Sequence, residues 1–214
     1  ESSDIFVLNT CSVTDNADKE CRQIVRSVLK NNPDTYVIVT GCYAQLQPTE
    51  IAEIQGVDLV LGSNEKFKLF DYVNGFEKNE LSCVFTSPIN EVTNFEYAYS
   101  SDIDSRTRAF LKIQDGCDYN CSFCTIPLAR GKSRSLAPAQ VIENAKKLIE
   151  SGYKEIVLTG VNTGDYTFQA DSKTYKLLDI LYELDRLNIP RLRISSIEPN
   201  LLNDEIIQLV KSSE

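Results

Sequence analysis

At 214 residues the chain has room for one large or two small domains, and its composition, 42% hydrophobic and 25% charged, is that of an ordinary globular protein. The net charge of -9 argues against an extended nucleic-acid surface, because phosphate binding needs positive charge; a basic surface is either local or outside this sequence. No apolar run approaches membrane length and no signal-peptide pattern opens the chain, so we expect a cytoplasmic protein with no membrane partner.

Residues 1–75 alternate strand-like and helix-like segments. The expected strands are 5–8, 36–39 and 57–61, and the expected helices are 14–30, one that begins at Pro48 and carries Ile51 and Ile54, and 63–72. Thr14 or Asp15 is the candidate cap of the first helix. Repeated units of this length predict a parallel sheet with helices on its faces. Residue 1 is not methionine and the first strand starts almost at once, so we expect a fragment of a longer protein.

Two cysteines follow predicted strands in this first region. Cys11 comes shortly after the strand 5–8, and Cys42 comes shortly after the strand 36–39. Functional groups of parallel sheets gather at the carboxyl ends of strands, and Gly41 gives the backbone freedom there. Both cysteines are therefore candidate cluster ligands, although buried structural cysteines are an alternative explanation.

Residues 76–107 form a predicted connector, acidic and polar after residue 90. One apolar run, 83–85, is the candidate for an added edge strand. We interpret Cys83, in that run, and Cys21, on the first predicted helix, as core-packing residues, because neither follows the end of a strand.

Three cysteines lie close together after the strand-like run 109–113. Cys117, Cys121 and Cys124 have the spacing C-x3-C-x2-C. Thiolates are the ligands of iron-sulfur clusters, and three of them leave one iron of a 4Fe-4S cluster open for chemistry. A tetrahedral zinc site would need a fourth ligand from elsewhere, since the chain has no histidine. A structural metal site remains the alternative to a reactive cluster.

Residues 108–214 repeat the strand-helix pattern three times. The expected strands are 110–113, 155–159 and 191–195, and the expected helices are 138–151, 175–187 and one that begins near Asn203. Three such units begin a barrel but cannot close it. The sequence therefore predicts an α/β protein, in which an N-terminal parallel-sheet domain at 1–75 and the connector precede a partial, truncated α/β barrel at 108–214.

Polar residues follow the second and third strands of the predicted barrel. Gly160 and Asn162 come after the strand 155–159, and Ser195, Ser196 and Glu198 come at the end of the strand 191–195 or just after it. Barrel sites form at these carboxyl ends, so we expect these groups to contact an adenosyl, ribose or amino-acid ligand. Ordinary loop chemistry is the alternative for Asn162 and Glu198.

The cysteine loop resembles that of the radical S-adenosylmethionine enzymes. In that superfamily the three cysteines hold a 4Fe-4S cluster, whose open iron chelates the amino and carboxylate groups of S-adenosylmethionine. The resemblance implies that one electron cleaves this cofactor to a 5′-deoxyadenosyl radical.

Motifs outside the loop extend the resemblance over nearly the whole chain. NTCSVT at 9–14 and TGCYAQ at 40–45 are similar to the N-terminal domain of the methylthiotransferases. GCDYNCSFCTIP at 116–127, ARGKSRS at 129–135 and RISSIEP at 193–199 most resemble the branch that modifies threonylcarbamoyladenosine in tRNA.

The resemblance implies two 4Fe-4S clusters and a two-cofactor reaction. A second, auxiliary cluster would take Cys11, Cys42 and a third cysteine that the family carries upstream and this chain lacks. The remaining barrel strands and a small RNA-binding domain are also missing, so we expect the fragment to be inactive alone. One S-adenosylmethionine would methylate a sulfur at the auxiliary cluster, and the other would give the radical that removes hydrogen from C2 of the modified adenine.

The implied partners are S-adenosylmethionine, the anticodon loop of tRNA, and a reductant such as flavodoxin or ferredoxin. Arg130 and Arg134, in the one compact basic segment near the cysteines, are candidates for contact with the cofactor or with RNA phosphate. A solvated surface is the ordinary alternative for such a segment.

Three other functions stay open. An enzyme acting on isopentenyladenosine in tRNA, or one acting on an aspartate of a ribosomal protein, would share the cysteines. From another class, the chain could be a non-catalytic iron-sulfur or zinc binding module, which would not cleave S-adenosylmethionine.

Overall fold

The computed structural model describes residues 3–11, 15–73, 75–78, 80–95, 107–170 and 172–213. The chain divides into two compact units, which we describe separately. The first unit holds residues 1–92 together with 119–131, and the second holds 93–118 together with 132–214. Residues 76–92, part of the predicted connector, thus group with the first unit. Within the described residues no helix combines the length and apolar character that a membrane crossing needs.

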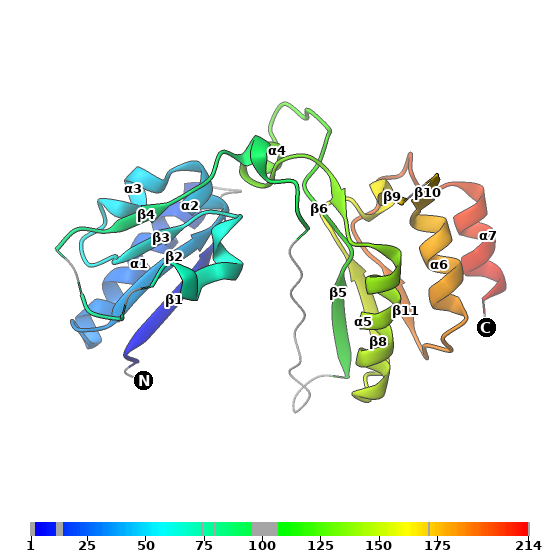
Figure 1. Ribbon diagram of the computed structural model, residues 1–214, viewed down its shortest axis with the longest axis horizontal. Helices are drawn as coiled ribbons and strands as arrows, with labels where there is room; N and C mark the ends of the chain where they lie inside the picture. Colours follow the sequence, from blue (N-terminus) through cyan, green and yellow to red (C-terminus); the bar gives the residue numbers. More distant parts are fainter. Residues whose placement is uncertain are drawn as a thin grey trace. The chain divides into compact units, whose positions relative to one another are not determined.

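A four-stranded parallel sheet forms the centre of the first unit (Figure 1). Its order is β1 (Ile5–Thr10), β2 (Tyr36–Gly41), β3 (Leu59–Leu61) and β4 (Cys83–Phe85). The parallel pairing of all four strands confirms the predicted sheet, and β4 is the edge strand expected at 83–85.

Helices cover both faces of this sheet. Successive residues of β2 point to opposite sides, so each face has its own set of packing residues. Val37 and Val39 pack with α1 (Asp15–Asn31), α2 (Cys42–Leu46) and α3 (Pro48–Ala52). Tyr36 and Ile38 pack on the other side, against Leu69 of the 3-10 helix η1 (Glu65–Asp71). The central strands β2 and β3 are therefore buried on both faces.

Several details of the first unit differ from the sequence prediction. The helix at Pro48 ends at Ala52, before Ile54, and the segment expected as a helix over 63–72 is the 3-10 helix η1. The short helix α2 was not predicted. Cys21 is buried as expected, but Cys83 is exposed, because it lies on an edge strand whose side chains face solvent. The candidate cap Thr14 lies outside the described residues.

The second unit contains a three-stranded parallel sheet in the order β11 (Leu192–Ile194), β8 (Glu155–Thr159) and β5 (Arg108–Lys112). Each strand precedes one of the helices α5 (Pro138–Glu150), α6 (Leu177–Asp185) and α7 (Asp204–Ser212). This order confirms the three predicted strand-helix units. The last helix begins as expected, because the Asn203 Oδ1 accepts a hydrogen bond from the Ile206 N–H at 2.9 Å.

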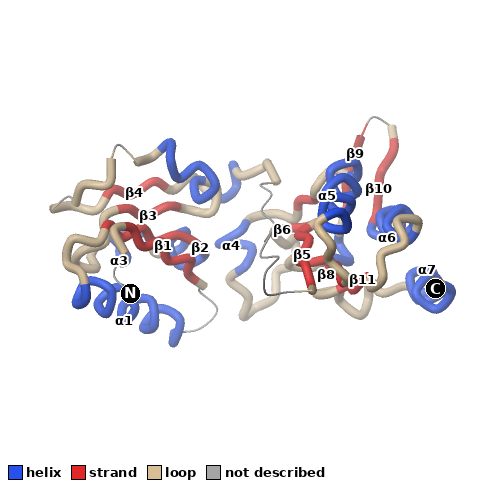
Figure 2. Tube along the Cα trace, turned by 90° about the horizontal axis from the view of Figure 1, so that it is seen from below, coloured by secondary structure: helices blue, strands red, loops and turns tan. Residues whose placement is uncertain are grey.

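The helices of the second unit gather on one side of its sheet (Figure 2). Ala109 and Leu111 of β5 are buried in this core, whereas Arg108 and Phe110 between them are exposed. Two short additions were not predicted. They are the antiparallel pair β6 (Gln114–Asp115) with β7 (Arg134–Ser135), and the hairpin β9 (Thr167–Ala170) with β10 (Lys173–Lys176).

Candidate functional site

Cys11 and Cys42 emerge side by side from the carboxyl edge of the first sheet. The parallel register pairs Thr10 with Gly41, so each cysteine is the residue that follows a paired strand end. Adjacent strands lie about 4.8 Å apart, which keeps the two chains close at this point. Both thiols are free; Cys11 is exposed and Cys42 is half-buried. The two predicted auxiliary ligands therefore lie at one edge of the sheet.

A glycine at position 41 is required by this close approach. Its φ of 103° lies in the region that side chains other than glycine rarely adopt. A Cβ there would lie 2.3 Å from the Thr10 carbonyl oxygen, and the Thr10 hydroxyl donates a 2.6 Å hydrogen bond to the Thr40 carbonyl. Gly41 thus lets the chain turn from β2 into α2 directly against β1, which places Cys42 beside the end of β1.

The residue after Cys42 anchors α2 in the core. Tyr43 is buried, its hydroxyl donates to the Glu50 carboxylate at 3.0 Å, and it accepts a hydrogen bond from the Arg22 guanidinium at 3.2 Å. Burial raises the pKa of Tyr43 above its usual value, because it disfavours the charged phenolate. The ring therefore fixes the start of α2, and with it the backbone of Cys42.

Cys121 and Cys124 belong to the first unit, and Cys117 belongs to the second. Cys121 is exposed and Cys124 is half-buried, and the Cys124 N–H donates to the Cys121 carbonyl at 3.1 Å. Within the described residues no three Cys, His, Asp or Glu side chains are already gathered as a metal site. The donor set itself fits an iron-sulfur cluster, because none of the three cysteines is in a disulfide and none is fully buried.

The helix α4 (Ile126–Arg130) follows Cys124 and packs on the first unit. The Ser63 hydroxyl donates to the Ala129 carbonyl at 2.8 Å. At the other end of the helix, a Cβ on Gly131 would lie 2.9 Å from the Ile89 carbonyl oxygen. With α4 held in this way, the Arg130 Nε donates to the Cys42 Sγ at 3.5 Å. One predicted binding residue thus contacts a predicted cluster ligand.

In the second unit a buried glutamine, Gln114, connects the strand-end loops. Its side-chain oxygen accepts hydrogen bonds from the N–H groups of Val161 and Asn162, both at 2.9 Å. Its side-chain nitrogen donates to the carbonyl of Gly116 at 2.8 Å and to the hydroxyl of Ser133 at 2.9 Å. Gln114 therefore joins the residue before Cys117 to the loop after β8.

Gly160 leaves room for this glutamine, since a Cβ at position 160 would lie 2.8 Å from the Gln114 Oε1. Gly160 was predicted from the sequence as a cofactor-binding position. The structure gives it a close approach to a neighbouring side chain, and its contact with a cofactor stays a prediction.

Asn162, Ser196 and Glu198 lie together at the ends of β8 and β11. The Asn162 Oδ1 accepts a hydrogen bond from the Glu198 N–H at 3.4 Å, and the Thr163 N–H donates to the Ser196 carbonyl at 2.8 Å. Asn162 is only 2% exposed, yet its side-chain nitrogen has no hydrogen-bond partner. A buried donor without a partner is costly, which marks this nitrogen as one that a polar ligand could satisfy.

Arg134 is held by groups of its own unit. Its guanidinium forms a 3.1 Å ion pair with Asp115, and the Lys112 ammonium lies 2.7 Å from the same carboxylate oxygen. The Arg134 Nε also donates to the Asn94 carbonyl at 3.0 Å. These contacts fix the β6–β7 pair, and the predicted contact of Arg134 with cofactor or RNA stays a prediction.

Sequence reasoning missed Gln114 and Asp115 as organising residues of the site. The available signal was a polar pair directly after the apolar run 109–113 and directly before Gly116, at a strand end. The partners of these side chains come from far along the chain, so their roles could not be read from spacing.

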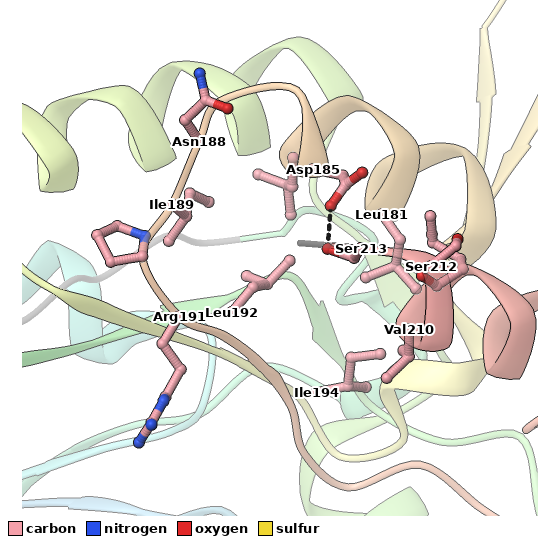
Figure 3. Close-up of a pocket in the computed structure, with 13 residues that line it drawn as sticks. Leu181, Asp185, Asn188, Ile189, Arg191, Leu192, Ile194, Val210, Ser212 and Ser213 are labelled. Carbon is pink, nitrogen blue, oxygen red and sulfur yellow. Dashed lines mark hydrogen bonds between the residues drawn. The ribbon is translucent and has the colours of Figure 1, made fainter.

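A pocket of about 640 Å³ in the second unit lies elsewhere, against α6, α7 and β11 (Figure 3). Leucine and isoleucine side chains form much of its lining, and the Ser213 hydroxyl donates to Asp185 at 2.5 Å at its margin. None of the predicted site residues lines this pocket. The polar strand ends, rather than this pocket, are the candidate functional site.

Two family descriptions match the chain. The Uncharacterized protein family UPF0004 matches residues 1–62, and the Radical SAM superfamily matches residues 111–214. The first match contains Cys11 and Cys42, and the second contains Cys117, Cys121 and Cys124. Both sets of predicted ligands therefore fall in recognised family regions.

Curated relatives align with the whole chain. It is 43% identical to the threonylcarbamoyladenosine tRNA methylthiotransferase MtaB of Bacillus subtilis, with 100% of this chain and 48% of the relative covered. It is 34% identical to the enzyme of that name from Aquifex aeolicus, with 100% and 52% covered. A tRNA-2-methylthio-N(6)-dimethylallyladenosine synthase of Pelagibacter ubique is 32% identical, with 100% and 49% covered. The chain thus spans about half the length of the curated relatives it matches.

A solved structure supports the fold. The radical S-adenosylmethionine methyltransferase TsrM of Kitasatospora setae matches with a TM-score of 0.65 and 16% identity, covering 100% of this chain and 47% of that protein. Such a likeness concerns architecture alone, and it agrees with the predicted combination of a parallel-sheet domain and a partial radical-enzyme barrel. Together with the cysteine pattern and the two family matches, these similarities show that the chain belongs to the radical S-adenosylmethionine methylthiotransferase family.

Proposed function

We propose that this chain is part of a tRNA methylthiotransferase that adds a methylthio group to C2 of N6-threonylcarbamoyladenosine, next to the anticodon. The observation that carries the proposal is the similarity of the whole chain to threonylcarbamoyladenosine tRNA methylthiotransferases, at 43% identity for the Bacillus subtilis protein. The enzyme would work in the cytoplasm, where tRNA and a reductant such as flavodoxin or ferredoxin are present.

The cysteines would hold two 4Fe-4S clusters. Cys117, Cys121 and Cys124 would hold one, and Cys11 and Cys42 would hold the other together with a ligand from outside this sequence. When bound, such clusters supply the electron that cleaves S-adenosylmethionine and the site at which sulfur is methylated. The absence of disulfides among the described cysteines supports this assignment.

The second unit would bind S-adenosylmethionine through its polar strand ends. The free donor on Asn162 suits a carboxylate or a ribose oxygen, and Ser196 and Glu198 lie in the adjoining loop. Gln114 fixes the backbone of the loops after β5 and β8, so a ligand would meet a preformed site. Arg130 and Arg134 are our further candidates for binding cofactor or RNA phosphate.

The tRNA substrate would be recognised mainly outside this chain. A net charge of -9 opposes phosphate binding over a large area. An anticodon-loop base is unpaired and can be turned out, so the radical site needs only to admit one base. We therefore assign the role of orienting the adenine to this chain and most phosphate contacts to the rest of the protein.

A second candidate is the dimethylallyladenosine branch, favoured by the 32% identical relative from Pelagibacter ubique. Its substrate differs from threonylcarbamoyladenosine only in the group on N6 of the adenine. A ribosomal aspartate as substrate and a non-catalytic iron-sulfur or zinc module are the remaining alternatives.

The test uses the protein at its full natural length, without oxygen, with S-adenosylmethionine, a reductant and tRNA from cells that lack the enzyme. Mass analysis of the digested nucleosides should show a methylthio group on threonylcarbamoyladenosine. The Cys124→Ala variant should abolish this product, whereas Cys83→Ala, which removes an exposed thiol outside the predicted ligand set, should retain it.

The nucleoside masses separate the alternatives. A methylthio mass on the dimethylallyl nucleoside would move the protein to the other tRNA branch. Cofactor cleavage with unchanged nucleosides would indicate a protein substrate. Absence of any cofactor cleavage by the reduced, cluster-loaded protein would contradict an enzymatic function.

A further inference from the structure

We propose that Arg130 is a positioning residue that hydrogen-bonds the Cys42 thiolate and sets the reduction potential and retention of the auxiliary cluster. The inference rests on the proposed function, because it requires a cluster on Cys11 and Cys42. It concerns a contact inside the first unit, between the helix that follows Cys124 and the thiol that follows β2.

The contact has the geometry of a hydrogen bond to sulfur. The Arg130 Nε lies 3.5 Å from the Cys42 Sγ, with its N–H directed at the sulfur. A guanidinium is always charged and offers its donors in a rigid plane, so it can donate to the sulfur of a cysteine that ligates a cluster. Cys42 is half-buried, which reduces screening of this interaction by water.

The surrounding structure holds both partners in place. On the arginine side, the hydrogen bond from the Ser63 hydroxyl to the Ala129 carbonyl holds α4 in the first unit. Gly131 at the end of α4 also packs closely against the Ile89 carbonyl. On the cysteine side, Gly41 and the buried ring of Tyr43 fix the start of α2. Neither partner needs to move far for the contact to persist.

A cation held on a ligand sulfur has a definite electrostatic effect. Reduction adds a negative charge to an iron-sulfur cluster, and hydrogen bonds to its sulfurs favour that more negative state. Arg130 should therefore raise the potential of the auxiliary cluster, and its removal should lower it. Partners of metal ligands also support binding, and their loss typically costs about 10- to 100-fold in metal affinity.

The position of Arg130 in the chain gives this contact a functional consequence. The segment that contains Cys121 and Cys124, ligands of the radical cluster in the proposed function, continues directly into the helix that ends at Arg130. A single segment would thus contribute ligands to one cluster and a tuning group to the other. This arrangement would link the assembly of the two clusters and the reduction potential of the auxiliary cluster to one segment of the chain.

The experiment measures each cluster by itself in the full-length protein. In a background with Cys117, Cys121 and Cys124 replaced by alanine, only the auxiliary cluster forms, and its midpoint potential, electron paramagnetic resonance spectrum and loss to an iron chelator are recorded. Arg130→Gln should lower the potential and make the cluster about tenfold or more easier to remove. Arg130→Lys, which keeps a positive charge, should shift the potential less.

Two controls separate this role from a general structural one. Arg186→Gln removes an equally charged side chain that is 71% exposed and pairs with Glu183, so it should leave the auxiliary cluster unchanged. In a background with Cys11 and Cys42 replaced by alanine, Arg130→Gln should leave the potential of the radical cluster unchanged.

The outcomes are distinct. An auxiliary cluster with the same potential and retention in Arg130→Gln and Arg186→Gln would overturn the inference and leave the proposed function standing. A shift confined to the radical cluster would also overturn it. A parent protein that binds no iron through Cys11 and Cys42 would overturn both the inference and the two-cluster function.

Discussion

Replacing the buried Gln114 with alanine should destabilise the strand-end loops of the second unit, where we propose that S-adenosylmethionine binds. Its side-chain oxygen is the acceptor for the N–H groups of Val161 and Asn162, and Gln114 has no exposed surface. Gln114→Ala leaves these two donors without that acceptor. A buried group that loses its partner costs about 1–3 kcal/mol, and water entering the vacated space offsets part of this cost. We expect a loss of about 2–4 kcal/mol in the free energy of unfolding of this unit.

Two measurements would detect the change. Urea unfolding followed by circular dichroism gives the stability, and hydrogen exchange gives the protection of the amides of Val161 and Asn162. A loss of 2–4 kcal/mol corresponds to a fall in protection of about 30- to 700-fold, because each 1.4 kcal/mol is a factor of about ten. Amides in the sheet of the first unit should keep their protection.

The matched control is Gln140→Ala, since Gln140 is an exposed glutamine on α5 of the same unit. Such a surface change should alter stability by less than about 0.5 kcal/mol. Equal stability of Gln114→Ala and Gln140→Ala, with unchanged exchange at Val161 and Asn162, would refute the role we give to Gln114.

Three further predictions concern a glycine at a strand end, a buried core tyrosine and an asparagine of the candidate site. Gly41→Ala should destabilise the first unit by about 1–3 kcal/mol more than Gly75→Ala in chemical unfolding, because both have positive φ but only Gly41 lies against the Thr10 backbone; equal losses would refute the clash. Burial raises the pKa of Tyr166, so its folded form keeps a proton that the unfolded chain releases above about pH 10. Stability should therefore be complete below that pH and fall above it, and Tyr166→Phe should weaken this alkaline loss in unfolding curves; an unchanged pH profile would count against it. Asn162→Asp keeps an acceptor but removes the unpartnered donor, so the cluster-loaded protein should bind S-adenosylmethionine about tenfold more weakly in calorimetry, and undiminished affinity would exclude this donor from the site.

The regular elements were predictable because local pattern determines them. The apolar residues 156–158 are flanked by Glu155 and Thr159, and the segment forms β8 over the predicted residues 155–159. The helix at 138–151 was visible from its 3.6-residue periodicity, its proline at the start and Gly152 after its end, and it forms α5. The parallel order of strands followed from the alternation of these elements.

The shortest elements could not be predicted, because a few residues carry no recognisable pattern. The five-residue helix α2 is too short to show a period, and the β6–β7 pair consists of two residues on each side. Cys83 has a hydrophobic neighbourhood in sequence, but its exposure depends on whether another element covers the edge strand. Such features are decided by tertiary packing, which a single sequence records only weakly.

The candidate site, too, was only partly predictable from the sequence. The cysteines were identified from spacing and from strand ends, and the register of Thr10 with Gly41 brings Cys11 and Cys42 to one sheet edge as expected. The contact of Arg130 with Cys42 and the bonds of Gln114 join residues far apart in sequence. No spacing rule could supply these contacts, because they depend on how loops dock on the sheets.

The most direct test of the two-cluster account is the iron content of cysteine variants of the full-length protein, purified and reconstituted without oxygen. The account predicts about eight iron atoms per chain in the parent and about four after alanine replacement of either Cys11 with Cys42 or Cys117 with Cys121 and Cys124. Cys83→Ala should keep the parent value, because this exposed thiol lies outside both sets. Zinc in place of iron, or iron that does not depend on these two sets of cysteines, would contradict the account.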